Sequence, residues 1–136
     1  MRVVIDTNLL LSSISPKSSS HWLYQAIFAG RFILCVTTDI LEEYDEIIEW
    51  GFRRRDVADT VLEALINSPF VEQINVSYFW WFITVDPDDN KFSDCAVAGG
   101  ADYLVTQDGH FDVLKGIAFP KVNVVGLDEF RSILRV

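Results

Sequence analysis

Two aspartates follow apolar, strand-like runs that are far apart in the sequence. Asp6 comes directly after Val3-Val4-Ile5, and Asp108 comes just after Tyr103-Leu104-Val105-Thr106. In an open α/β sheet the ligand crevice lies outside the carboxyl ends of the strands, so these two acids can meet at one edge. A lone aspartate at a strand end can equally well cap the next segment. Two aspartates in equivalent places favour a shared site.

Glu43 stands out among the acids of a predicted helix over residues 39–50. The other acids on this helix follow the spacing i, i+3, i+4, i+7 and form a solvated stripe: Glu42, Asp45, Glu46 and Glu49. Glu43 instead falls on the row of Ile40, Ile47 and Trp50, on the core side. A half-buried carboxylate is costly unless positive charge meets it. Either a metal ion or a basic side chain from elsewhere in the chain is therefore expected beside Glu43.

Asp94 lies on a second predicted helix, over residues 91–99. Phe92, Cys95 and Ala96 are spaced to pack on a sheet, and Asp94 falls near the opposite edge of that helix. Taken alone, Asp94 is a solvated surface acid. Taken with the other three carboxylates, it supplies a fourth oxygen ligand.

The chemistry of these four acids points to a hard cation. Carboxylates without a His or Cys cluster favour Mg²⁺ or Mn²⁺ over zinc, and His21 and His110 are expected to be surface or packing residues. Four acids brought together would repel one another and raise each other's pKa, so metal binding would relieve that repulsion.

The elements that must position these residues alternate along the chain. Strands are predicted at 3–5, 32–36, 70–76, 103–106 and 122–125, and helices at 22–29, 39–50, 56–66, 91–99 and 128–134, with a polar loop over 12–20. Residues 77–85, with five aromatic residues in a row, fit no single period. Alternation of this kind predicts one α/β domain over residues 1–136, a three-layer α/β/α sandwich around a central, mostly parallel sheet.

Composition narrows the class of protein. The chain has 136 residues, half of them apolar, and a net charge of -9. Residues 86–112 hold seven acids and one base, Lys91, and so carry -6 of that charge. A uniformly basic nucleic-acid-binding surface is excluded, and concentrated acid suggests bound cations or a solvated loop. Cys35 and Cys95 are expected as reduced core residues, and no segment suggests a signal peptide or membrane span, so we expect a cytoplasmic protein.

Four motifs together resemble the PIN domain, over Arg2 to about Val125. They are Asp6-Thr7-Asn8, Leu41-Glu42-Glu43-Tyr44, Asp86-Pro87-Asp88-Asp89-Asn90-Lys91-Phe92 leading to Asp94-Cys95-Ala96, and Ala101-Asp102-Tyr103-Leu104-Val105-Thr106-Gln107-Asp108. More narrowly, they resemble the VapC-like ribonucleases that are the toxin components of prokaryotic toxin–antitoxin systems.

This resemblance implies a metal-dependent endoribonuclease. Its catalytic, metal-binding pocket would be carried by Asp6, Glu43, Asp94 and Asp108, with Mg²⁺ or Mn²⁺ as the cofactor. The supporting positions implied are Asn8, Thr106 and Asp89, which matches a further acid of this branch. The helical row independently selects Glu43 over Glu42. The family also implies a homodimer and an antitoxin partner.

Other features leave alternatives open. Arg53-Arg54-Arg55 can contact RNA phosphates or form a solvated helix end that offsets Asp56, Asp59 and Glu49. The net charge favours a short single-stranded or loop RNA over a long duplex. Trp80-Trp81 can stack on bases or pack in the core or an interface.

Two rival functions belong to different classes. The first is a phosphatase with Asp6 as nucleophile, which is disfavoured because position 8 is Asn and no lysine that could hold the phosphoryl group is evident after the second motif. The second is a non-catalytic PIN-like module that only binds RNA or an antitoxin. The presence of all four acids argues against loss of activity.

Overall fold

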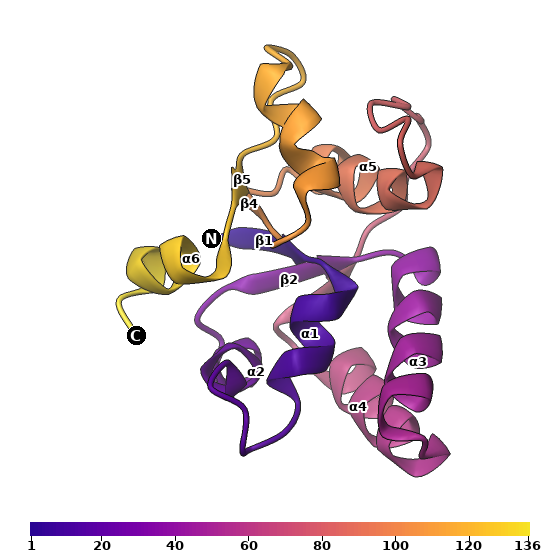
Figure 1. Cartoon of the computed structure of the whole chain (residues 1–136), viewed down its shortest axis with the longest axis vertical. Helices are drawn as coiled ribbons and strands as arrows, with labels where there is room; N and C mark the ends of the chain where they lie inside the picture. The colour runs from indigo at the N-terminus through magenta and orange to yellow at the C-terminus, as the bar shows by residue number, and fades with distance from the viewer.

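A five-stranded sheet in the order β3-β2-β1-β4-β5 forms the centre of the protein (Figure 1). The structure is a computed structural model that describes residues 1–136. The strands are β1 (Arg2–Ile5), β2 (Ile33–Val36), β3 (Val71–Gln73), β4 (Tyr103–Val105) and β5 (Val124–Val125). All four pairings are parallel, which confirms the predicted fold class.

Helices cover both faces of this sheet. The α-helices are α1 (Thr7–Ser13), α2 (His21–Phe28), α3 (Thr38–Phe52), α4 (Arg55–Asn67), α5 (Asn90–Ala98) and α6 (Leu127–Leu134), and the 3-10 helices are η1 (Pro87–Asp89) and η2 (Gly109–Gly116). Figure 1 shows α1 to α4 on one side of the sheet and α5 with η2 on the other. The three-layer arrangement is therefore the predicted one. None of the helices is both long and apolar enough to cross a membrane.

The chain changes direction between β1 and β4. From β1 it builds outward to β2 and β3, then returns through α5 to place β4 on the other side of β1 and continues to β5. Such a switch point leaves a crevice at the carboxyl ends of the two strands that flank it, because the following segments diverge. Asp6 follows one of these strands and Asp108 lies just beyond the other.

Four local expectations differ from the structure. A helix, α1, covers Thr7–Ser13, where no helix was expected and where the loop expected over 12–20 begins, because Leu9 and Leu10 are buried and the Leu10 N–H donates to the Asp6 carbonyl (3.2 Å). The strands expected over 70–76 and 122–125 are confined to Val71–Gln73 and Val124–Val125. Residues 109–116 form η2, which the sequence pattern did not indicate. Residues 77–85 form no helix or strand, in line with their lack of a period.

Tyr44 ties α3 to the strand that carries Asp6. Its side chain is fully buried, and its hydroxyl donates to the carbonyl of Ile5 (2.5 Å), the last residue of β1. Burial raises the pKa of Tyr44 well above its ordinary value, so the hydroxyl stays a donor. The contact holds the carboxyl end of the central strand β1 against the middle of α3.

We predict that Tyr44→Phe lowers the free energy of unfolding by about 1–3 kcal/mol, because the buried Ile5 carbonyl loses a donor. The measurement is urea denaturation followed by circular dichroism. Tyr78→Phe is the matched control, since Tyr78 is 64% exposed and its hydroxyl makes no hydrogen bond. Equal midpoints for the two variants would contradict the prediction.

Candidate metal-binding site

Asp6 and Asp108 are linked through Thr106. The β1–β4 register places Ile5 opposite Val105, so the residues after them also lie side by side. The Asp6 N–H donates to the Val105 carbonyl (3.1 Å), and the Thr106 hydroxyl donates to Asp6 Oδ2 (2.9 Å). The same hydroxyl accepts from the Asp108 N–H (3.0 Å). Thr106, which is buried, thereby holds the two aspartates in a defined relation.

Asp89 approaches this pair from α5's side of the sheet. His110 Nδ1 lies 3.2 Å from Asp89 Oδ2 and 3.7 Å from Asp108 Oδ1, and the His110 N–H donates to Asp108 Oδ1 (2.9 Å). Ligand atoms of Asp86, Asp89 and His110 all lie within 4.8 Å of one another. The acidic segment 86–89 therefore faces the start of η2, where Asp108 caps the helix.

These carboxylates perturb one another. Burial raises the pKa of Asp6, the Thr106 hydroxyl and the Thr7 N–H oppose that rise, and the charges of Asp108 and Glu43 add to it. Burial likewise raises the pKa of Asp89 to about 6, with the His110 hydrogen bond lowering it and the charges of Asp86, Asp108 and Asp6 raising it further. Asp6, Asp89 and Asp108 therefore lie near enough to one another for their charges to interact.

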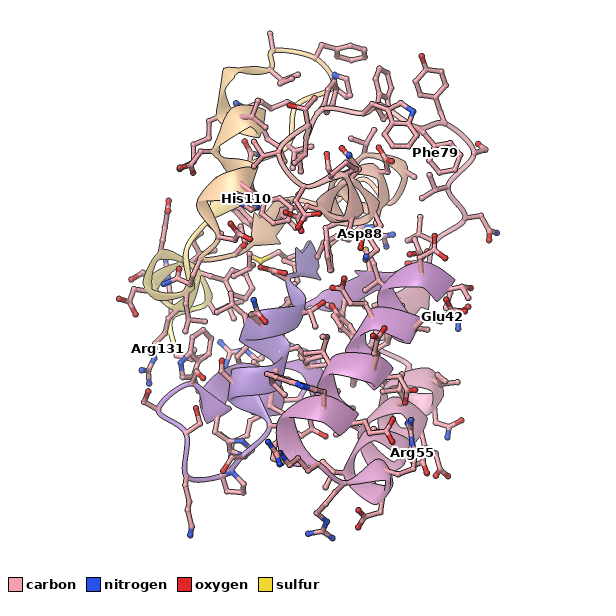
Figure 2. All side chains as sticks on the ribbon, turned by 45° about the vertical axis from the view of Figure 1, so that its right-hand side comes forward. Glu42, Arg55, Phe79, Asp88, His110 and Arg131 are labelled. Carbon is pink, nitrogen blue, oxygen red and sulfur yellow. The ribbon has the colours of Figure 1, made fainter.

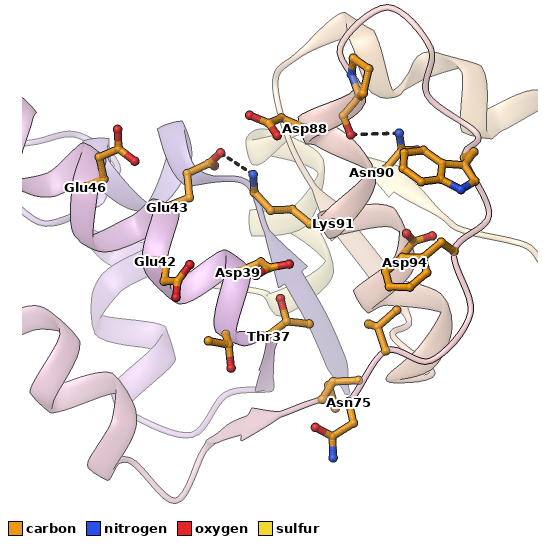
Figure 3. Close-up of a pocket in the computed structure, with 16 residues that line it drawn as sticks. Thr37, Asp39, Glu42, Glu43, Glu46, Asn75, Asp88, Asn90, Lys91 and Asp94 are labelled. Carbon is orange, nitrogen blue, oxygen red and sulfur yellow. Dashed lines mark hydrogen bonds and ion pairs between the residues drawn. The ribbon is translucent and has the colours of Figure 1, made fainter.

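Glu43 lies beside this site and has a basic partner. One of its oxygens accepts from the Thr7 hydroxyl, and Oε1 lies 2.8 Å from Lys91 Nζ (Figure 3). Of the two alternatives that the sequence left open, the structure shows the basic side chain. Glu43 also lies at the edge of the buried face of α3 rather than at its centre, since Trp50, on the same helical row, is 74% exposed. Glu43 remains near Asp6, whose pKa it raises.

Asp94 lies apart from the cluster. Its carboxylate is buried and accepts the Trp80 N–H (3.1 Å), and burial raises its pKa while that hydrogen bond lowers it. One turn earlier, the Asn90 side chain holds the backbone of Ile83 through both its donor and its acceptor. This face of α5 therefore fastens the irregular segment before η1. Asp89 pairs with His110, which also contacts Asp108, whereas Asp94 is held by the Trp80 backbone.

The remaining predicted residues divide between the site and the periphery. The Asn8 side chain is exposed in the first turn of α1. Arg54 pairs with Asp56, and Arg55 pairs with Asp45, Glu49 and Asp59, while Arg53 is exposed at the end of α3. Figure 2 shows Arg55 at the far end of the helices from His110 and Asp88. Arg54 and Arg55 therefore have acidic partners of the kind that the sequence offered as an alternative to RNA.

The aromatic segment is mostly outside the core. Trp80 is half-buried between Tyr78 and Phe82, with ring centroids 4.5 and 5.6 Å away, and Trp81 is 66% exposed in a left-handed conformation (φ 55°). Cys35 and Cys95 are both free and buried, as predicted.

The donor set fits a hard divalent cation. Three carboxylates at a sheet edge offer anionic oxygen ligands, which Mg²⁺ and Mn²⁺ prefer. His110 adds one nitrogen, which Mn²⁺ accepts more readily than Mg²⁺. Sequence reasoning set His110 aside because it has no neighbouring histidine. Its place two residues after a strand-end aspartate was the available signal, since the turn after such a residue faces the same crevice.

Comparison with known proteins identifies a family and a similar fold. A family model described as "PIN domain" matches residues 2–110. Among solved structures, the chain is similar to a chain of VapBC2 from Rickettsia felis, crystallised bound to a DNA fragment from their promoter. The TM-score is 0.63 at 15% sequence identity, covering 93% of this chain and 98% of that one. A search of curated proteins finds no match.

We predict that the metal-free protein becomes less stable as the pH rises from about 4 to about 6. The pKa of Asp89 is about 6 in the folded protein against 3.8 ordinarily, so the folded state binds the proton more tightly over this interval and loses that advantage as the pH rises. Asp89→Asn removes this contribution, and it raises the Tm of the metal-free protein at pH 7 because one repelling charge is gone.

Thermal unfolding in EDTA at pH 4 to 7 measures this effect. Glu63→Gln is the control, because Glu63 is exposed on α4 and makes no ion pair. The prediction fails if Asp89→Asn and Glu63→Gln show the same dependence of Tm on pH.

Proposed function

We propose that this chain, which belongs to the PIN domain family, is a metal-dependent endoribonuclease that hydrolyses RNA phosphodiester bonds. The observation that carries the proposal is the set of Asp6, Asp108 and Asp89 at the switch point of the sheet, where Thr106 links Asp6 to Asp108 and His110 contacts both Asp108 and Asp89. An acidic site of this kind is stabilised by cations and reaches phosphate through them.

The proposed roles follow from the contacts. Asp6, Asp89 and Asp108 would hold one or two Mg²⁺ or Mn²⁺ ions, with Glu43 at the rim. Such an ion, when bound, neutralises charge on the scissile phosphate and acidifies a water molecule. Thr106 orients Asp6 by donating to Oδ2, and His110 orients Asp89. One carboxylate of the set would accept the proton of the attacking water. Asp94, predicted as a ligand, is proposed instead to fasten the segment at Trp80.

Substrate, partners and location are proposals of the same kind. The net charge of -9 favours a short single-stranded or loop RNA. The similarity to a chain of the VapBC2 complex supports a toxin role with an antitoxin partner. A homodimer and a cytoplasmic location complete the proposal.

One alternative is a PIN-like module that binds RNA or an antitoxin without cleaving. The complete acidic cluster argues against it. The phosphatase alternative is weaker, because Asp6 is only 7% exposed and one of its oxygens already accepts from Thr106.

We predict cleavage of a pool of short single-stranded RNAs in Mg²⁺ or Mn²⁺ that EDTA abolishes. Asp6→Asn and Asp108→Asn should each lower the rate at least about 100-fold, since loss of a ligand that holds the charge-neutralising ion removes several kcal/mol of transition-state stabilisation. Glu63→Gln should cleave like the unsubstituted protein. RNA binding without cleavage by the unsubstituted protein would favour the non-catalytic module, and a trapped phospho-aspartate at Asp6 would favour the phosphatase.

We further predict that two neighbouring aspartates give opposite results. Asp89→Asn should lose cleavage and weaken Mn²⁺ binding, because it removes a carboxylate of the cluster. Asp94→Asn should keep both within about threefold, because the amide oxygen still accepts from the Trp80 N–H. Isothermal titration with Mn²⁺ and the cleavage assay measure the two effects. Loss of Mn²⁺ binding in a folded Asp94→Asn protein would restore Asp94 to the metal set.

A further inference from the structure

Lys91 is the single base in the lining of an acidic cavity. The cavity has a volume of about 560 Å³ and lies between the start of α3, the segment around residues 74–81 and the first turn of α5. Its acids are Asp39, Glu42, Glu43, Glu46, Asp88 and Asp94. Glu43 and Lys91 line it, whereas Asp6, Asp89 and Asp108 do not. Lys91 therefore lies on the boundary between the cavity and the carboxylate cluster.

The ammonium group of Lys91 is held in place by a chain of contacts. It lies 2.8 Å from Glu43 Oε1, the other Glu43 oxygen accepts from the Thr7 hydroxyl, and Thr7 directly follows Asp6. Figure 3 shows the side chain reaching from α5 across to Glu43 on α3. Only 17% of the Lys91 side chain is exposed. A positive charge is thereby fixed at the edge of the proposed metal site.

Stability alone does not account for this position. A cation in the first turn of a helix is opposed by the helix dipole, and a partly exposed lysine–glutamate pair contributes at most about 1 kcal/mol. The ammonium group also has three N–H donors. It lies 5.7 Å from the centroid of the Phe92 ring, and Glu43 is its one ion-pair partner in the structure. Two donors are left for a group that enters from the cavity.

We infer that Lys91 binds a phosphate of the RNA strand next to the bond that is cleaved. The inference rests on the proposed function and adds to it a contact made by the protein itself rather than by a metal ion. The surrounding carboxylates repel an unshielded phosphate, so the strand can approach only where positive charge is fixed. Lys91 is one such place, the proposed metal ions would be the other, and Glu43 is the positioning residue that holds Lys91 beside them.

The competing explanation is that the Lys91–Glu43 ion pair is only a structural strut, which joins α3 to α5 and does not contact RNA. RNA binding separates the two explanations when cleavage is prevented. We would measure the fluorescence anisotropy of a labelled 12-nucleotide single-stranded RNA in Mg²⁺, in the Asp6→Asn background, at several KCl concentrations. Lys91→Met, Lys91→Arg and Lys115→Met are compared in that background. Lys115 is the matched control, because it also pairs with an acid, Asp112, but is 60% exposed on η2.

We predict that Lys91→Met weakens RNA binding about fivefold at 0.1 M salt and lowers the slope of log K against log salt by about 0.7, the value for one phosphate contact to a single strand. Lys91→Arg should keep the slope, and Lys115→Met should change neither quantity. Unchanged affinity and slope in Lys91→Met would overturn the inference.

A second variant covers the case in which Lys91→Met leaves Glu43 unpaired and fails to fold. Lys91→Gln with Glu43→Gln removes both charges together. Phosphate binding predicts that the reduced slope persists in this variant, whereas a strut predicts full RNA binding. If the unsubstituted protein neither binds nor cleaves RNA, the proposed function and the inference both fail. If it cleaves RNA and the Lys91 variants bind normally, only the inference fails.

Discussion

The parallel pairing of β1 with β4 is the constraint on which the rest of the site depends. It sets Ile5 beside Val105 and so places Asp6 beside Thr106, although 100 residues separate them. Because the chain reverses its direction of growth between these two strands, the segments that follow them diverge and leave the strand ends open. The carboxylates are close together because of the backbone ladder and in spite of their charge.

That closeness has an electrostatic consequence. The three aspartates lie where water is partly excluded, and burial together with mutual repulsion raises the pKa of Asp6 and Asp89. Hydrogen bonds from Thr106 and His110 stabilise the charged forms and fix their orientation. The net effect is a preorganised, negatively charged edge that a divalent cation would stabilise. Beside the cluster, the Lys91 ammonium group and the Thr7 hydroxyl stabilise the charge of Glu43 in a similar way.

Asp89 and Asp94, both in the acidic 86–94 segment, have different partners. Asp89 ends η1 and faces His110, whereas Asp94 is a turn into α5 and accepts from the Trp80 backbone. In this acidic segment, Asp89 contacts His110 and Asp94 holds the aromatic segment through Trp80. Lys91, which lies between Asp89 and Asp94 in the sequence, lines the cavity against α3.

The sequence by itself determined the alternation of strands and helices, the parallel sheet and the position of Asp6 and Asp108 at the ends of two strands, because strand ends and hydrophobic periods are local signals. It also indicated that Glu43 needs a positive partner. Only the tertiary structure decided that this partner is Lys91, that His110 contacts both Asp89 and Asp108, and that Asp94 accepts a hydrogen bond from the Trp80 backbone. The physical reason is that each of these contacts joins residues on different elements. Their geometry depends on where α5 and η2 pack against the sheet, which no local spacing records.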